Sequence, residues 1–238
     1  MSLYPRSGAV GINSQPRSPS EATRSLWKIF DKHLATEYKR VELLAMWTTD
    51  SPVVMTNKLV RHPDDLIGLK IRTPSANQAA IIKGLGAIPV AMPMPHTYGA
   101  LEKGVVDGAI VGISVVNSFR LAEVVKNYII DLPFGFSPQI LAMNKKTFNS
   151  LTPRQKAYIN KNRGLELSLK GARLYEAARR RGIATIEKRA DTQIIKLTAA
   201  ERAAWENRLE KVVAKWIADF QQQGLPYRQI HADYIRGR

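Results

Sequence analysis

The sequence predicts an α/β fold with a mainly parallel sheet, and the prediction rests on the stretch between residues 64 and 112. Three short apolar runs, at residues 69–72, 88–92 and 105–112, have the length and β-branched content of strands. Glycine and proline residues separate these runs and bracket two segments that are compatible with helices. The resulting order, strand–helix–strand–helix–strand, is typical of parallel strands joined by crossover helices.

The two helices of this stretch are predicted from their end signals. Ser75 can cap the first helix, and Gly84 and Gly86 stand where that helix should end. Pro95 can open the second helix, and Gly104 can end it. Both helices are therefore short, as expected for the crossovers of a compact α/β unit.

Arg72 is the main candidate for a binding residue. It lies at the carboxyl end of the first predicted strand, directly before a helix N-terminus. In open α/β sheets the carboxyl ends of the strands border the ligand crevice. A helix N-terminus already attracts anions, so a guanidinium beside it favours a carboxylate. From the position of Arg72 alone, the alternative interpretation is that this arginine forms a structural salt bridge.

The segments that precede the central stretch are predicted from a capping box and two apolar runs. Ser18, with Pro19 and Glu21, opens a helix that should extend to about residue 36. Residues 41–47 and 53–56 then read as strands.

The segments that follow it include the longest helical pattern of the chain. Strands are expected at residues 128–132 and 140–143. A capping box, Thr152 and Gln155, opens the longest helix, at residues 152–181, and Gly182 stops it. Further expected elements are a strand at 183–186, a helix from 198 to 224 and a final helix at 227–235. The helix from 198 to 224 begins with a capping box, Thr198 and Glu201, and carries a stripe of aromatic residues.

Composition excludes several classes of function. The chain has 238 residues, 45% of them hydrophobic and 24% charged, as in globular proteins. It has no cysteine, and its four histidines are scattered, so neither a disulfide nor a metal site is expected. No nucleophile elbow, zinc-protease motif or phosphate loop is present. We therefore expect neither an enzyme nor a bound cofactor, and a hydrolase is the disfavoured alternative.

The net charge of +16 raises the question of nucleic acid binding. The basic residues are spread along the chain, and the single tight run, residues 179–181, falls in a helical pattern, where a solvated face is expected. No base-reading element accompanies them, so no specific nucleic acid partner is expected, and a basic nucleic-acid-binding module remains an alternative. The charge would attract anionic solutes and an acidic partner surface.

Three motifs carry a resemblance to a known family. D-D-L-I-G-L-K-I-R-T-P at 64–74, L-G-A-I-P-V-A-M-P at 85–93 and T-Y-G-A-L-E-K-G-V-V-D-G at 97–108 resemble the DctP-type solute-binding proteins of tripartite ATP-independent periplasmic (TRAP) transporters. The resemblance implies two α/β lobes around a cleft, joined by crossing strands and a long connecting helix. It also implies a periplasmic protein that captures a small organic acid and passes it to membrane subunits.

The resemblance also suggests how the chain is divided. It starts near Trp27, and the first third of the family fold has no counterpart, so lobe I is expected to be incomplete and prone to self-association. Lobe I would comprise residues 18–49 and 138–177, and lobe II residues 50–137 and 178–238. Residues 1–17 would be disordered or extended, with 1–15 poorly ordered, and they contain no apolar signal-peptide core. A truncated relic that binds no ligand is the main alternative.

The family's arginine of the K-x-R motif corresponds to Arg72, which would clamp the carboxylate of the solute. Departures from the family pattern suggest a less polar pocket. Val111 stands where the family often has a polar residue, and His96 stands where it commonly has a glutamate. Pro52 stands where the family has a second arginine. We therefore expect a monocarboxylate or keto acid with an apolar tail.

The remaining expected pocket residues are apolar, and they are Met94, Val111, Trp47 and Phe136. Phe136 belongs to a segment, residues 133–138, that would cross between the lobes with its rings toward the cleft. An ordinary loop with core-packed phenylalanines is the equal alternative for that segment.

Overall fold

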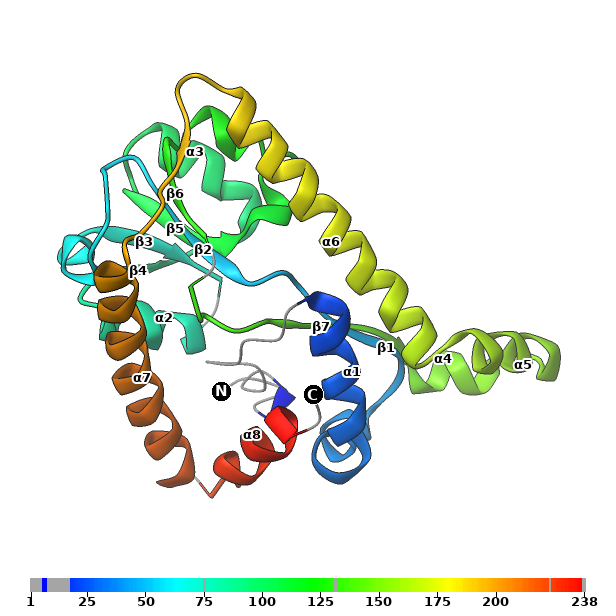
Figure 1. Cartoon of the computed structure of the whole chain (residues 1–238). Helices are drawn as coiled ribbons and strands as arrows, with labels where there is room; N and C mark the ends of the chain where they lie inside the picture. Colours follow the sequence, from blue (N-terminus) through cyan, green and yellow to red (C-terminus); the bar gives the residue numbers. More distant parts are fainter. Residues whose placement is uncertain (1–5, 8–17, 75, 131, 223, 237–238) are drawn as a thin grey trace.

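The computed structural model describes residues 6–7, 18–74, 76–130, 132–222 and 224–236 (Figure 1). The predicted helix cap at Ser75 lies outside these residues. The same holds for the expected poor order of residues 1–15, of which only Arg6 and Ser7 are described.

The chain forms an α/β fold with two sheets, which confirms the predicted class (Figure 1). The larger sheet has the strand order β4-β3-β5-β2-β6-β8, and the smaller pairs β1 with β7. The central part of the larger sheet is the predicted strand–helix–strand–helix–strand unit, because β3 (Lys70–Thr73) pairs in parallel with both β4 (Ile88–Ala91) and β5 (Gly108–Gly112). Strand β2 (Pro52–Thr56) runs antiparallel to β5 and β6, so the sheet is mixed.

The crossover helices of this unit form close to where their end signals place them. Helix α2 (Ala76–Gly84) joins β3 to β4, and α3 (Thr97–Glu102) joins β4 to β5. Gly104 has a positive φ of 67°, consistent with its predicted role in ending α3.

The smaller sheet pairs β1 (Val41–Thr48) with β7 (Pro138–Asn144) in antiparallel fashion. Helices α1 (Pro19–Ile29) and α8 (Tyr227–Arg236) share one buried core beside it, which includes Leu26, Met46, Ile230 and Tyr234. The last helix therefore packs with the first helix, although they lie at opposite ends of the described chain. The exact residue boundaries of the two lobes remain a prediction.

The remaining elements connect or cover these sheets. They are η2 (Phe30–Leu34), η3 (Ala35–Tyr38), η4 (Pro63–Leu66), η5 (Met94–His96), η6 (Ile113–Val115), η7 (Leu121–Glu123), β6 (Asn127–Ile129), α4 (Lys145–Ser150), α5 (Pro153–Asn162), α6 (Leu165–Lys188), β8 (Gln193–Ile194) and α7 (Ala199–Gln222).

The expected unbroken helix from residue 152 to 181 is wrong, because the chain breaks it at Gly164. This glycine has a φ of +90°, and its N–H donates to the Leu44 carbonyl at 2.8 Å. A residue with a side chain would be strained in this conformation. Two helices result, α5 and α6, and the second runs alongside both sheets (Figure 1).

The expected helix stop at Gly182 and the strand at 183–186 are also wrong, because α6 continues to Lys188. Gly182 allows close packing instead of ending the helix. A Cβ atom at this position would lie 2.6 Å from the carbonyl oxygen of Ile113, which leaves room only for glycine. Ile186, predicted in a strand, is buried with Ile113 in the core of the larger sheet.

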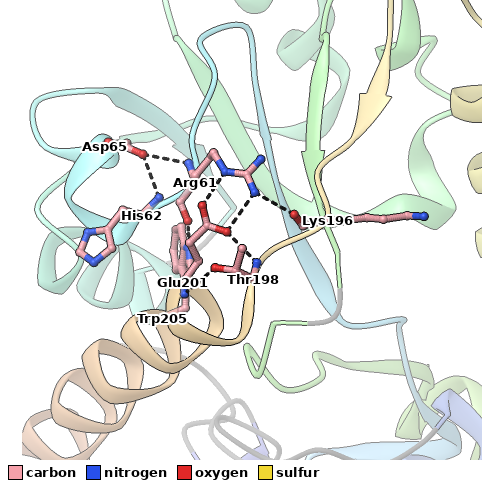
Figure 2. A network of polar contacts seen from close by, with 7 residues as sticks. All are labelled: Arg61, His62, Asp65, Lys196, Thr198, Glu201 and Trp205. Carbon is pink, nitrogen blue, oxygen red and sulfur yellow. Dashed lines mark hydrogen bonds and ion pairs between the residues drawn. The ribbon is translucent and has the colours of Figure 1, made fainter.

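Helix α7 is anchored to the loop before η4 by a polar network (Figure 2). The Arg61 guanidinium donates from Nε and Nη2 to the two Glu201 oxygens at 2.5 and 2.9 Å. Glu201 also accepts from the Thr198 N–H at 2.6 Å, and the Thr198 hydroxyl accepts from the Glu201 N–H at 3.2 Å. This is the predicted capping box, extended by an arginine from a distant part of the chain.

We expect Glu201→Gln to lower the melting temperature near neutral pH. Hydrogen bonds from Arg61, then from Thr198, lower the pKa of Glu201 from 4.5 to about 2. The stabilisation is therefore fully present above about pH 4.5 and is lost as the pH falls toward 2. Melting curves at pH 7 and pH 3 should show a gap between wild type and variant that narrows in acid. Glu210→Gln, on an exposed position of the same helix, is the control and should show no such gap.

Candidate functional site

Arg72 is the penultimate residue of β3, and its side chain is buried in the protein. It is 2% exposed, and its Nε and Nη2 atoms both donate to the carbonyl oxygen of Met92, at 3.2 and 3.0 Å. Met92 directly follows β4, and its N–H donates to the Thr73 carbonyl at 3.2 Å. The guanidinium is thereby held at the carboxyl ends of two neighbouring parallel strands, where the sequence predicted it.

No acidic side chain pairs with Arg72 among the residues that the structure describes, so the alternative of a structural salt bridge gains no support there. Burial lowers the pKa of the Arg72 guanidinium, because it removes water from the charged form. A buried charge without an opposite charge beside it is costly. An arginine in this state is suited to an anionic ligand, which would supply the missing charge.

Two of the expected apolar pocket residues lie near the same end of the larger sheet. Met94 and Val111 are partly buried, and both pack on the cluster that contains Val53 and Met55. Val90 and Met92, from β4 and its end, pack on this cluster too. The carboxyl ends of β4 and β5 are therefore surrounded by apolar side chains, beside the strand that carries Arg72.

Trp47 is in β1, in the smaller sheet. Its ring packs on Gly171 of α6, where an added Cβ atom would lie 2.7 Å from the ring carbon Cδ2. Its Nε1 atom is buried and has no hydrogen-bond partner among the described residues. The contacts of Trp47 thus connect β1 to α6, and its place in a ligand pocket stays a prediction.

The crossing segment between β6 and β7 buries both of its phenylalanines. Phe134 is 7% exposed and makes an edge-to-face contact with Trp205, with ring centroids 6.5 Å apart. The ring of Phe134 belongs to the core of the larger sheet, as expected for a loop with core-packed phenylalanines. Phe136 is 8% exposed, and its role as a pocket residue stays a prediction.

Asp50 was not predicted as a functional residue; it is 1% exposed and lies at the junction of β1 and β2. Its Oδ1 accepts from the Ser114 hydroxyl at 2.5 Å, and its Oδ2 accepts from the Ser114 N–H at 3.1 Å. Burial raises the pKa of Asp50, while Ser114 and the charge of Arg179 oppose that rise. The local signal was only an aspartate before Ser51-Pro52, and such residues are usually exposed turn residues.

The solvated face expected for residues 179–181 holds for Arg180 and Arg181, which are exposed. Arg179 differs, since its Nη1 atom is buried and its charge acts on Asp50. Within the described part of the chain, no group of three or more acidic or histidine side chains could hold a metal ion. None of the helices described there combines the length and apolar content needed to cross a bilayer.

Comparison with known proteins gives a family match over most of the chain. The profile of the family described as bacterial extracellular solute-binding protein, family 7 (DctP), matches residues 20–219. The C4-dicarboxylate-binding periplasmic protein DctP of Rhodobacter capsulatus is 29% identical over 182 residues. That alignment covers 74% of this chain and 53% of the relative, so the chain spans about half the length of this relative.

Two solved structures share the fold closely. A marine-metagenome TRAP solute-binding protein, specific for aromatic acid ligands and solved with metahydroxyphenylacetate, superposes with a TM-score of 0.91 at 26% identity, covering 99% of this chain and 75% of that one. A TRAP solute-binding protein from Rhodoferax ferrireducens, solved with copurified benzoate, also has a TM-score of 0.91, at 27% identity, with coverage of 99% and 74%. The chain belongs to the family 7 (DctP) bacterial extracellular solute-binding proteins of TRAP transporters.

Proposed function

We propose that the chain captures a small organic acid outside the cytoplasm and delivers it to the membrane subunits of a TRAP transporter. The observation that carries this proposal is the Arg72 guanidinium, which is buried without an acidic partner among the described residues. A carboxylate would accept parallel charge-assisted hydrogen bonds from it and would offset the desolvated charge. The family match supports a periplasmic location, because the R. capsulatus relative is a periplasmic protein.

We propose a monocarboxylate with an apolar or aromatic tail as the ligand. Met94, Val111 and their neighbours offer an apolar surface near Arg72. The two similar structures were solved with aromatic acids, metahydroxyphenylacetate and benzoate. A C4-dicarboxylate is the second candidate, because the R. capsulatus relative binds such acids.

Calorimetric titration with four compounds tests the ligand class. Benzoate and a branched keto acid should bind at least about tenfold more tightly than succinate, because a second carboxylate in an apolar pocket would be desolvated without a partner. Benzamide, a neutral molecule of nearly the same shape as benzoate, serves as the control and should not bind. Tighter binding of succinate would favour the dicarboxylate, and binding of benzamide as tight as benzoate would contradict a carboxylate site. Binding of no acid would support the non-binding alternative.

A further inference from the structure

The two sheets are joined by segments that lie together. The first, residues 49–51, links β1 to β2, and the second, residues 132–137, approaches β7. The Thr49 N–H donates to the Ser137 carbonyl at 2.9 Å, and the Ser51 hydroxyl to the Leu132 carbonyl at 3.4 Å. The third connection is α6, which runs beside both sheets (Figure 1).

Helix α6 is attached to both sheets by side chains or close packing. Toward the smaller sheet, the Ser168 hydroxyl accepts from the Met46 N–H at 2.9 Å. Toward the larger sheet, Gly182 packs on Ile113, the first residue of η6. A change in the angle between the sheets must therefore alter the position of α6 relative to η6 or to β1.

Asp50 lies where these connections meet. Its carboxylate binds both the N–H and the hydroxyl of Ser114, in η6, at 3.1 and 2.5 Å. It also fills the space next to Gly112, where a Cβ atom would lie 2.3 Å from Oδ1. On α6, one turn before Gly182, Arg179 lowers the pKa of Asp50, and the pKa of Tyr175 is raised by its own burial and then by Asp50. Asp50 therefore holds η6 at the end of β5, and η6 in turn packs on α6 where Ile113 meets Gly182.

The end of β5 also carries Val111, directly before Gly112. Since Val111 lines the apolar cluster beside Arg72, any shift of Gly112 and Ser114 would move part of the ligand surface. We propose that Asp50 is a positioning residue for the ligand site. Asp50 keeps the end of β5 that carries Val111 in a fixed position relative to α6, at the hinge between the two sheets. This inference rests on the proposed function for its effect on binding, whereas the coupling of β5 to α6 stands on the contacts alone.

The test compares Asp50→Asn and Ser114→Ala with Asp65→Asn. Asp65 is a matched control because its Oδ2 also accepts two backbone N–H groups, those of Arg61 and His62, both at 2.8 Å, but away from the hinge. Hydrogen exchange of the empty protein, melting temperature and benzoate affinity are measured for each variant. If Asp50→Asn does not fold, the same measurements are made on Ser114→Ala, which removes only the hydroxyl donor.

In Asp50→Asn we expect amide exchange to rise on the order of tenfold in residues 112–116 and in α6 near residue 179, and benzoate to bind roughly tenfold more weakly. Asp65→Asn should raise exchange only near residues 61–65 and leave affinity unchanged. Unchanged exchange in residues 112–116, or unchanged affinity in a fully folded Asp50→Asn, would overturn the proposal, because a merely structural aspartate lowers only the melting temperature. If the wild-type chain binds no acid, the proposed function fails, and the exchange pattern alone decides whether Asp50 couples β5 to α6.

Discussion

Arg72→Met should abolish most carboxylate binding while leaving the empty protein at least as stable as wild type. Removing one partner of a buried, charge-assisted pair costs roughly 3–5 kcal/mol, because the ligand carboxylate is left desolvated and unpaired. At about 1.4 kcal/mol per decade, the affinity for benzoate should fall on the order of a hundredfold or more. Without ligand, the side chain is 2% exposed and has no acidic partner among the described residues, so its loss removes a cost.

Arg72→Lys separates charge from geometry at the same position. Lysine keeps the positive charge but cannot make two parallel hydrogen bonds to one carboxylate. It should therefore recover only part of the lost affinity, and calorimetric titration beside melting curves provides the comparison. An Arg72→Met chain that binds benzoate like wild type would remove Arg72 from the site. A variant that unfolds would show that the bonds to the Met92 carbonyl are structural.

Trp205→Ala should be the most destabilising single change in the core of the larger sheet. The side chain is fully buried, packs edge-to-face on Phe134, and donates from Nε1 to the Arg61 carbonyl at 2.8 Å. Truncation of a buried tryptophan costs about 3–5 kcal/mol, because it leaves a cavity. For a chain of this size we expect the melting temperature to fall by roughly 10 °C. A fall of a degree or less would mean that the surroundings close over the cavity.

Phenylalanine substitutions at two tryptophans isolate the contribution of the indole N–H. Trp205→Phe leaves the Arg61 carbonyl without its donor and should cost about 1 kcal/mol or more. Trp47→Phe removes a buried N–H that has no partner among the described residues, so it should cost clearly less. Equal losses in urea unfolding of the two variants would contradict this assignment of hydrogen bonds.

Features encoded locally were predicted well. The capping residues Ser18, Thr152 and Thr198 precede α1, α5 and α7, because a capping box needs only residues within one turn. The central β3–α2–β4–α3–β5 unit and the position of Arg72 at a strand end followed from apolar runs and their punctuation.

Features that depend on distant contacts were not predicted. Gly182 carries the same local signal whether it ends a helix or packs against another backbone, and only its contact with Ile113 decides between them. The burial of Asp50 depends on Ser114, 64 residues away. The packing of Trp47 on Gly171 depends on where α6 lies. A single sequence does not show which distant residues contact each other.

Carboxylate binding by Arg72 is tested most directly by a crystal structure of the chain with benzoate or 3-hydroxybenzoate. We expect a carboxylate whose two oxygens accept hydrogen bonds from the Arg72 guanidinium at about 2.7–2.9 Å, with the ring against Met94 and Val111. A carboxylate bound elsewhere, with Arg72 still paired only to the Met92 carbonyl, would contradict it.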